Sequence, residues 1–128
     1  AASVVYKRQA VKKIEGLNSS DMILDIGPVS TKELKEVISN SKTVFWNGPP
    51  GVFEVEPFNK ATIEIAKHIA DLTSAGKIQS FAGGGDTVTA IEMAGVKEKF
   101  TYISTGGGAL LELLEGKQLP GLVSQNIL

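Results

Sequence analysis

The stretch IQSFAGGGDT at residues 78–87 contains the pattern that decides the fold. Its first five residues are typical of a strand, three glycines follow, and the apolar run after Thr87 has the spacing of a helix. Because glycine has no Cβ, several backbone N–H groups of such an elbow can face one ligand. The helix that follows adds the positive end of its dipole. The stretch therefore predicts a strand, a turn and a helix with an anion site between them.

The same alternation recurs along the chain. Residues 100–104 form a second strand-like run before a second glycine elbow, which leads into a leucine-rich helical run ending at Gly116. Upstream, the runs MILDI (22–26) and TVFW (43–46) also read as strands. Each is followed by a helical pattern, the first opened by a capping box at 30–33 and the second covering 58–72. Four such units predict an α/β fold: a Rossmann-like parallel sheet flanked by helices in three layers, in an incomplete domain.

Parallel strands place all their carboxyl ends at one edge of the sheet, where ligands bind in open α/β folds. The predicted loops there are 25–28, 47–51, 83–87 and 104–108. Neither elbow completes a dinucleotide fingerprint, since the third glycine position is Val88 or Leu111, and the chain has no P-loop motif. The four loops contain no Lys or Arg, so positive charge for a phosphate must come from magnesium or from other sequence.

Composition removes several classes of function. Thirteen basic against 14 acidic residues give no general attraction to nucleic acid or to an anionic membrane. The absence of cysteine excludes disulfides and thiolate chemistry, and with no signal peptide or membrane span in the sequence we expect a cytoplasmic protein. Trp46 is interpreted as a packing residue. His68 is interpreted as a surface or hydrogen-bonded histidine and not as a catalytic one.

Four motifs, in their order and separation, resemble the carboxy-terminal part of phosphoglycerate kinase: DIGP (25–28), WNGPPGVFE (46–54), GGGDT (83–87) and STGGGA (104–109) followed by LLEGK (113–117). The resemblance covers nearly the whole chain. It implies a two-domain, monomeric glycolytic enzyme that moves a phosphoryl group between 1,3-bisphosphoglycerate and MgADP, giving 3-phosphoglycerate and MgATP. Residues 1–128 would be the carboxy-terminal part of its nucleotide-binding domain, with no second domain in the chain.

The resemblance also implies roles for individual residues. Asp86 would meet the magnesium ion, and Glu54 would bind the ribose. Other expected ligands of the nucleotide are Gly84, Gly85, Thr87, Asn47, Pro49, Val52 and Leu24. Gly106, Gly107 and Gly108 would offer catalytic amides to the transferring phosphoryl group.

Two other interpretations stay open at this stage. The chain could be a non-catalytic module that binds a purine nucleotide, or a structural fragment with an exposed apolar face. Pro50 departs from the Val, Leu or Met more frequent in the family and should stiffen its loop. The family's basic clamp residues lie upstream of the motifs found here, so we expect the isolated chain to be inactive.

Overall fold

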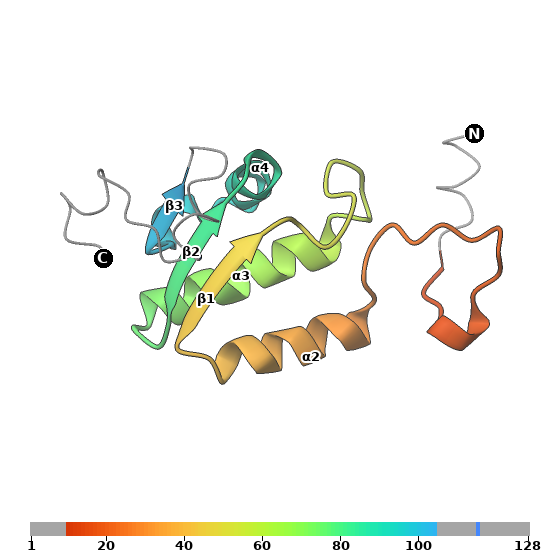
Figure 1. Ribbon diagram of the computed structural model, residues 1–128, viewed down its shortest axis with the longest axis horizontal. Helices are drawn as coiled ribbons and strands as arrows, with labels where there is room; N and C mark the ends of the chain where they lie inside the picture. Colours follow the sequence, from red (N-terminus) through yellow and green to blue (C-terminus); the bar gives the residue numbers. More distant parts are fainter. Residues whose placement is uncertain (1–9, 105–114, 116–128) are drawn as a thin grey trace.

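The computed structural model describes residues 10–104 and residue 115. It contains three α-helices, three strands and two short 3-10 turns in that part of the chain (Figure 1). Their order is η1 (Ile14–Gly16), α2 (Pro28–Ser39), β1 (Thr43–Asn47), α3 (Lys60–Ser74), β2 (Gln79–Gly83), α4 (Gly85–Met93), η2 (Lys97–Lys99) and β3 (Tyr102–Ser104). No helix of these described residues is long and apolar enough to cross a membrane.

The strands form one parallel sheet in the order β1-β2-β3. In this sheet Phe45 is paired with Phe81, and Phe81 with Tyr102. Strands joined by helices and running in parallel confirm the predicted α/β class. Because side chains alternate along a strand, the three paired aromatic residues share one face of the sheet.

The hydrophobic core lies on the opposite face, where Trp46 and Ala82 pack with helical side chains. Ile69 of α3 and Ile91 of α4 are almost completely buried there, and Ile38 of α2 joins them. Figure 1 shows α3 running along the sheet behind β1 and β2. Residues 10–104 thus supply the sheet and one layer of helices. On the other face the rings of Phe45 and Phe81 are stacked, with centroids 5.1 Å apart.

The expected strand at 22–26 is wrong. These residues pair with no strand in the structure, and the Met22 and Ile23 side chains are 67% and 72% exposed. A strand needs a hydrogen-bonded neighbour, and the segment lies beyond α2, away from β1 (Figure 1). The apolar run is therefore not a buried strand, because no neighbouring strand covers it in the described part of the chain.

The helix boundaries also differ in detail from the predictions. Helix α2 begins at Pro28 with Gly27 as N-cap and no capping box. Proline at the first helical position has the backbone angle a helix requires, which explains the earlier start. Helix α3 begins at Lys60, after Phe58, and is otherwise as predicted. The expected leucine-rich helix and its stop at Gly116 lie outside the described residues.

Candidate functional site

The predicted glycine elbow after β2 is present. Gly83 ends the strand, Gly84 is the N-cap of α4 with φ of 93°, and the helix begins at Gly85. A Cβ on Gly84 would lie only 2.8 Å from Oδ1 of Asn47, so both the backbone angle and the close approach of β1 require glycine. The first N–H groups of α4 have no partner within the helix, as at any helix start. They are therefore suited to bind an anion.

Thr87 connects this elbow to the loop after β1. Its side chain is 1% exposed, and its Oγ1 accepts a hydrogen bond of 2.6 Å from the backbone N–H of Gly48. A hydroxyl near a helix start can cap the helix, but no side chain caps α4. The hydroxyl instead reaches a loop 39 residues earlier in the chain. Two predicted binding loops are thereby held next to each other.

Trp46 holds the other side of the same peptide segment. Its indole Nε1 donates a hydrogen bond of 2.8 Å to the carbonyl oxygen of Gly48. The ring is 8% exposed and lies 6.4 Å from the ring of Phe100. Trp46 is therefore a packing residue, as predicted, and it also fixes Gly48, whose φ is 100°.

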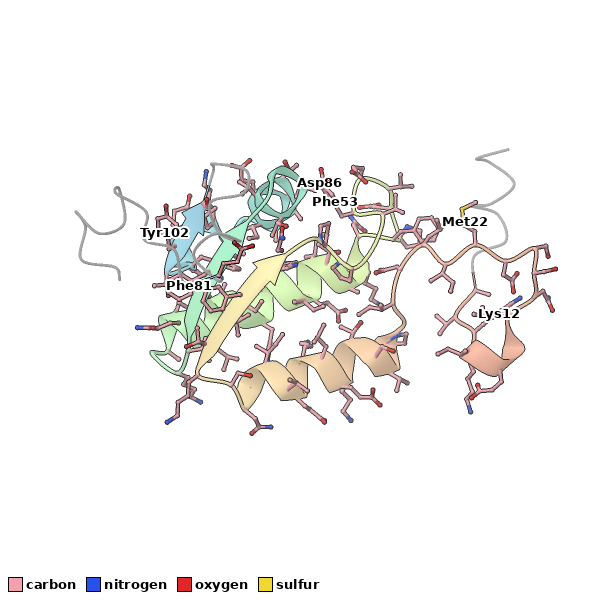
Figure 2. The ribbon with its side chains drawn as sticks, in the orientation of Figure 1. Lys12, Met22, Phe53, Phe81, Asp86 and Tyr102 are labelled. Carbon is pink, nitrogen blue, oxygen red and sulfur yellow. The ribbon has the colours of Figure 1, made fainter. Side chains whose placement is uncertain are left out.

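The residues expected around the base and ribose lie along the loop between β1 and α3. The backbone N–H of Val52 donates a hydrogen bond of 2.8 Å to the carbonyl oxygen of Leu24, so these two distant residues do meet. Val52 is 38% exposed, while Phe53 beside it is buried. Glu54 is exposed at the outer part of the loop. Figure 2 shows Phe53 and Asp86 on the same side of the molecule, near the ends of β1 and β2.

Asp25 is a residue that sequence reasoning did not single out. Its carboxylate accepts hydrogen bonds from the backbone N–H groups of Ile26, at 2.8 Å, and Ala61, at 3.3 Å. Burial raises the pKa of this carboxyl above its ordinary value, and the nearby Glu64 carboxylate adds to the rise, against the two N–H groups that lower it. The only signal in the sequence was its place in the DIGP loop. Its partner in α3 could not be inferred from spacing.

Asp86 is exposed in the first turn of α4. Within residues 10–104 and 115, no group of three or more His, Cys, Asp or Glu side chains is arranged to hold a metal ion. A site with one carboxylate suits magnesium that is bound mainly through phosphate oxygens, because Mg²⁺ commonly takes one or two carboxylates plus substrate phosphates. The carboxylate and the adjoining helix start therefore fit a magnesium-bound phosphate group.

His68 lies between two helices. Its Nε2 is 2.8 Å from Oγ of Ser39 and 3.0 Å from the carbonyl oxygen of Lys35, both in α2. This confirms its interpretation as a hydrogen-bonded histidine that links α2 and α3.

A sequence model of the family described as phosphoglycerate kinase matches residues 1–117, most of the chain. The chain belongs to the phosphoglycerate kinase family. It is 55% identical over 109 residues to the phosphoglycerate kinase of Agrobacterium fabrum, covering 85% of this chain and 27% of that protein. With the phosphoglycerate kinase of Caulobacter vibrioides the identity is 52% over 115 residues, covering 90% of this chain and 29% of that protein.

Solved structures of phosphoglycerate kinases are similar to this chain in fold. The structure from Coxiella burnetii superposes with a TM-score of 0.77 at 38% identity, covering 84% of this chain and 27% of that one. The structure from Pyrococcus horikoshii gives a TM-score of 0.68 at 36% identity, covering 91% of this chain and 27% of that one. The chain thus spans less than a third of the length of these phosphoglycerate kinases.

Among the residues expected to act in a phosphoglycerate kinase site, Gly106, Gly107 and Gly108 lie outside the described residues. A shallow hollow of about 390 Å³ lies elsewhere, beside η2 and β3. It is lined by Lys97, Glu98, Phe100, Thr101, Tyr102 and Ile103. None of these is an expected ligand. We therefore place the candidate site at the loops that the Gly48–Thr87 hydrogen bond joins, because the expected ligands lie there, and not at this hollow.

Proposed function

We propose that the chain is the carboxy-terminal part of the nucleotide-binding domain of a phosphoglycerate kinase, and that its strand-end loops hold the magnesium nucleotide. The observation that supports this most directly is the hydrogen bond between Gly48 and Thr87. It joins the WNGPPGVFE loop to the GGGDT elbow at the carboxyl edge of a parallel sheet, the position where open α/β folds bind ligands.

In this proposal, the phosphates lie against the start of α4. The backbone N–H groups of Gly85 and its neighbours donate to phosphate oxygens, and Gly84 permits the close approach. Asn47, whose Oδ1 faces Gly84, borders the same group. The carboxylate of Asp86 holds the magnesium ion, which when bound neutralises charge on the phosphate oxygens. Thr87 takes part through its backbone N–H, because its side chain is buried and holds the Gly48 loop.

The nucleoside lies toward the loop between β1 and α3. Pro49, Val52 and Leu24 line the base and ribose, and the hydrogen bond from Val52 to Leu24 brings two of them together. Glu54, exposed on the same loop, accepts hydrogen bonds from ribose hydroxyls. Gly106, Gly107 and Gly108 remain proposed donors to the transferring phosphoryl group.

The reaction proposed for the complete protein is reversible phosphoryl transfer from 1,3-bisphosphoglycerate to MgADP. Catalysis of this step depends on positioning and on positive charge around the moving group. The loops of the site carry no Lys or Arg. The triose substrate and the basic side chains are therefore assigned to a second, amino-terminal domain.

Two measurements on the complete protein test this proposal. Calorimetric titration with ADP, with and without magnesium, should show binding that is tighter with magnesium. A coupled assay with 1,3-bisphosphoglycerate and MgADP should then show turnover. Binding without turnover would favour the second candidate, a non-catalytic purine-nucleotide module, and absence of both would contradict the nucleotide site itself.

A further inference from the structure

Asp25 reaches the loop after β1 from a segment well before it in the chain. Its Oδ2 accepts a hydrogen bond of 3.3 Å from the backbone N–H of Ala61, 36 residues later and in the first turn of α3. The N-cap residue of α3, Asn59, makes no capping hydrogen bond with its own side chain. Asp25 therefore supplies an acceptor for a first-turn N–H group of α3 that the N-cap side chain does not cap.

The loop is shaped to admit this carboxylate. A Cβ on Gly51 would overlap Oδ1 of Asp25 and would lie 2.5 Å from the carbonyl oxygen of Phe58. The backbone at Gly51 thus packs directly against the carboxylate on one side and against the end of its own loop on the other. Glycine is required here by the close approach.

A second contact joins the same two segments one residue away on each side. Leu24 precedes Asp25, Val52 follows Gly51, and the Val52 N–H donates to the Leu24 carbonyl oxygen at 2.8 Å. The side chain of Asp25 and the backbone of Leu24 therefore hold the loop at two adjacent points. Glu54 follows two residues after Val52.

We propose that Asp25 is a positioning residue for the nucleoside end of the nucleotide site. It fixes the loop of residues 48–59 between Leu24 and the start of α3, and so sets the spacing of Val52 and Glu54. This inference rests on the proposed function. Asp25 itself contacts protein backbone and is not assigned any contact with the nucleotide.

A role limited to stability and a role in positioning predict different kinetics. Displacing the loop should weaken the binding of ADP and leave the binding of the triose substrate unchanged, because no triose contact is assigned to this loop. A general loss of stability should affect both substrates alike. The ratio of the two KM values is therefore the informative quantity.

The test uses the complete kinase. In Asp25→Ala the KM and Kd for ADP should rise about tenfold, since small displacements of positioning groups have large effects. The kcat and the KM for 1,3-bisphosphoglycerate should change by less than about twofold. Asp25→Asn keeps an oxygen that can accept from Ala61 and should rescue most of the loss. Asp21→Ala is the matched control, because Asp21 bonds to Lys12 and Asn18 instead of the loop.

Gly51→Ala provides a second, independent variant that keeps the carboxylate but places a Cβ against it. It should raise the KM for ADP in the same selective way. An Asp25→Ala enzyme with the wild-type KM for ADP, or with both KM values raised equally, would overturn the inference. Failure of the wild-type kinase to bind MgADP would overturn the proposed function instead, and the inference with it.

Discussion

Thr87 shows how one buried hydroxyl can hold two loops of a proposed site together. The side chain is nearly inaccessible, and its oxygen is committed to the Gly48 amide. Gly48 is also held through its carbonyl oxygen by Trp46. One peptide segment in the first loop is thus fixed from two sides, and the start of α4 lies at a defined distance from it.

Replacing this hydroxyl should release the Gly48 amide. In Thr87→Val the shape is kept but the acceptor is lost, and the loss of one such hydrogen bond costs about 0.5–1.5 kcal/mol. We expect faster hydrogen exchange at the Gly48 amide, measured by NMR on the complete protein, and near-normal exchange in Thr87→Ser. Thr89→Val is the control, because the Thr89 hydroxyl is exposed and bonds within its own helix. Unchanged exchange in Thr87→Val would show that the bond contributes nothing.

Asp86 should matter for turnover more than for binding of the bare nucleotide. The proposed role is to hold magnesium on phosphate oxygens, and a carboxylate repels a phosphate that carries no metal. Asp86→Ala in the complete kinase should lower kcat by about 10²-fold or more, the effect typical of removing one electrostatic group that acts on a transition state.

Steady-state kinetics at saturating magnesium and titration with metal-free ADP separate the two effects of Asp86. The Kd for metal-free ADP should stay the same or decrease. Near-normal turnover in Asp86→Ala would remove Asp86 from the magnesium site. Glu92→Ala is a suitable control, since Glu92 is in the same helix but bonds to Lys97 at its far end.

At the scale of elements, periodicity and turn chemistry predicted most of what the structure contains. The parallel strands, the long helix α3 and the glycine elbow before α4 all depend on local patterns, and the structure confirms them. The strand predicted at 22–26 is wrong because a strand needs a second segment to pair with, and the sequence of one segment does not reveal its neighbour. Asp25 was missed for the same reason, as its partner lies 36 residues away.

The candidate site was predicted in part. The sequence placed the glycine elbow, Asn47 and Asp86 at one edge, and the structure brings the Gly48 and Gly84 loops together there. It did not predict that the Thr87 hydroxyl would be used inside the protein, because a helix cap and a contact between loops require the same residue type. Family resemblance, not spacing, supplied the ribose and base residues.

The junction between Asp25 and α3 predicts a pH dependence of stability. The pKa of this carboxyl is raised in the folded state, mainly by burial. The folded protein therefore binds the proton more tightly than the unfolded chain does. The associated stabilisation is fully present below the ordinary pKa of 3.8 and is lost as the pH rises through the higher folded value.

Melting temperatures of the wild-type protein and Asp25→Asn, measured across this pH range, test the sign of this pH dependence. The stability of the wild type relative to Asp25→Asn should fall as the pH increases, because the amide does not titrate. Other groups cancel in the difference between the two proteins. A difference that grows in favour of the wild type with rising pH would contradict the assignment of burial as the dominant cause.

At the scale of the whole molecule, the chain contains the nucleotide side of a proposed site and not its cationic side. The strand-end loops supply backbone amides and carboxylates, but no Lys or Arg. The chain spans less than a third of its relatives. The proposed function therefore assigns the positioning of the acyl phosphate and the neutralisation of the moving group to residues outside this chain.

The isolated chain of 128 residues should accordingly show no measurable phosphoglycerate kinase activity. A coupled assay with 1,3-bisphosphoglycerate and MgADP, using the complete kinase as the control, measures this directly. Turnover within about a hundredfold of the complete enzyme would contradict the view that positioning and charge come from elsewhere. Weak binding of nucleotide by the isolated chain is compatible with the proposal.

Trp46 is the one tryptophan in the chain, and its position makes it a natural fluorescent reporter. Its indole N–H is bonded to the Gly48 carbonyl, the same residue whose amide is held by Thr87. Indole emission responds to the loss of a hydrogen bond and to entry of water around the ring. Any movement of the WNGPPGVFE loop against α4 should therefore change the emission of Trp46.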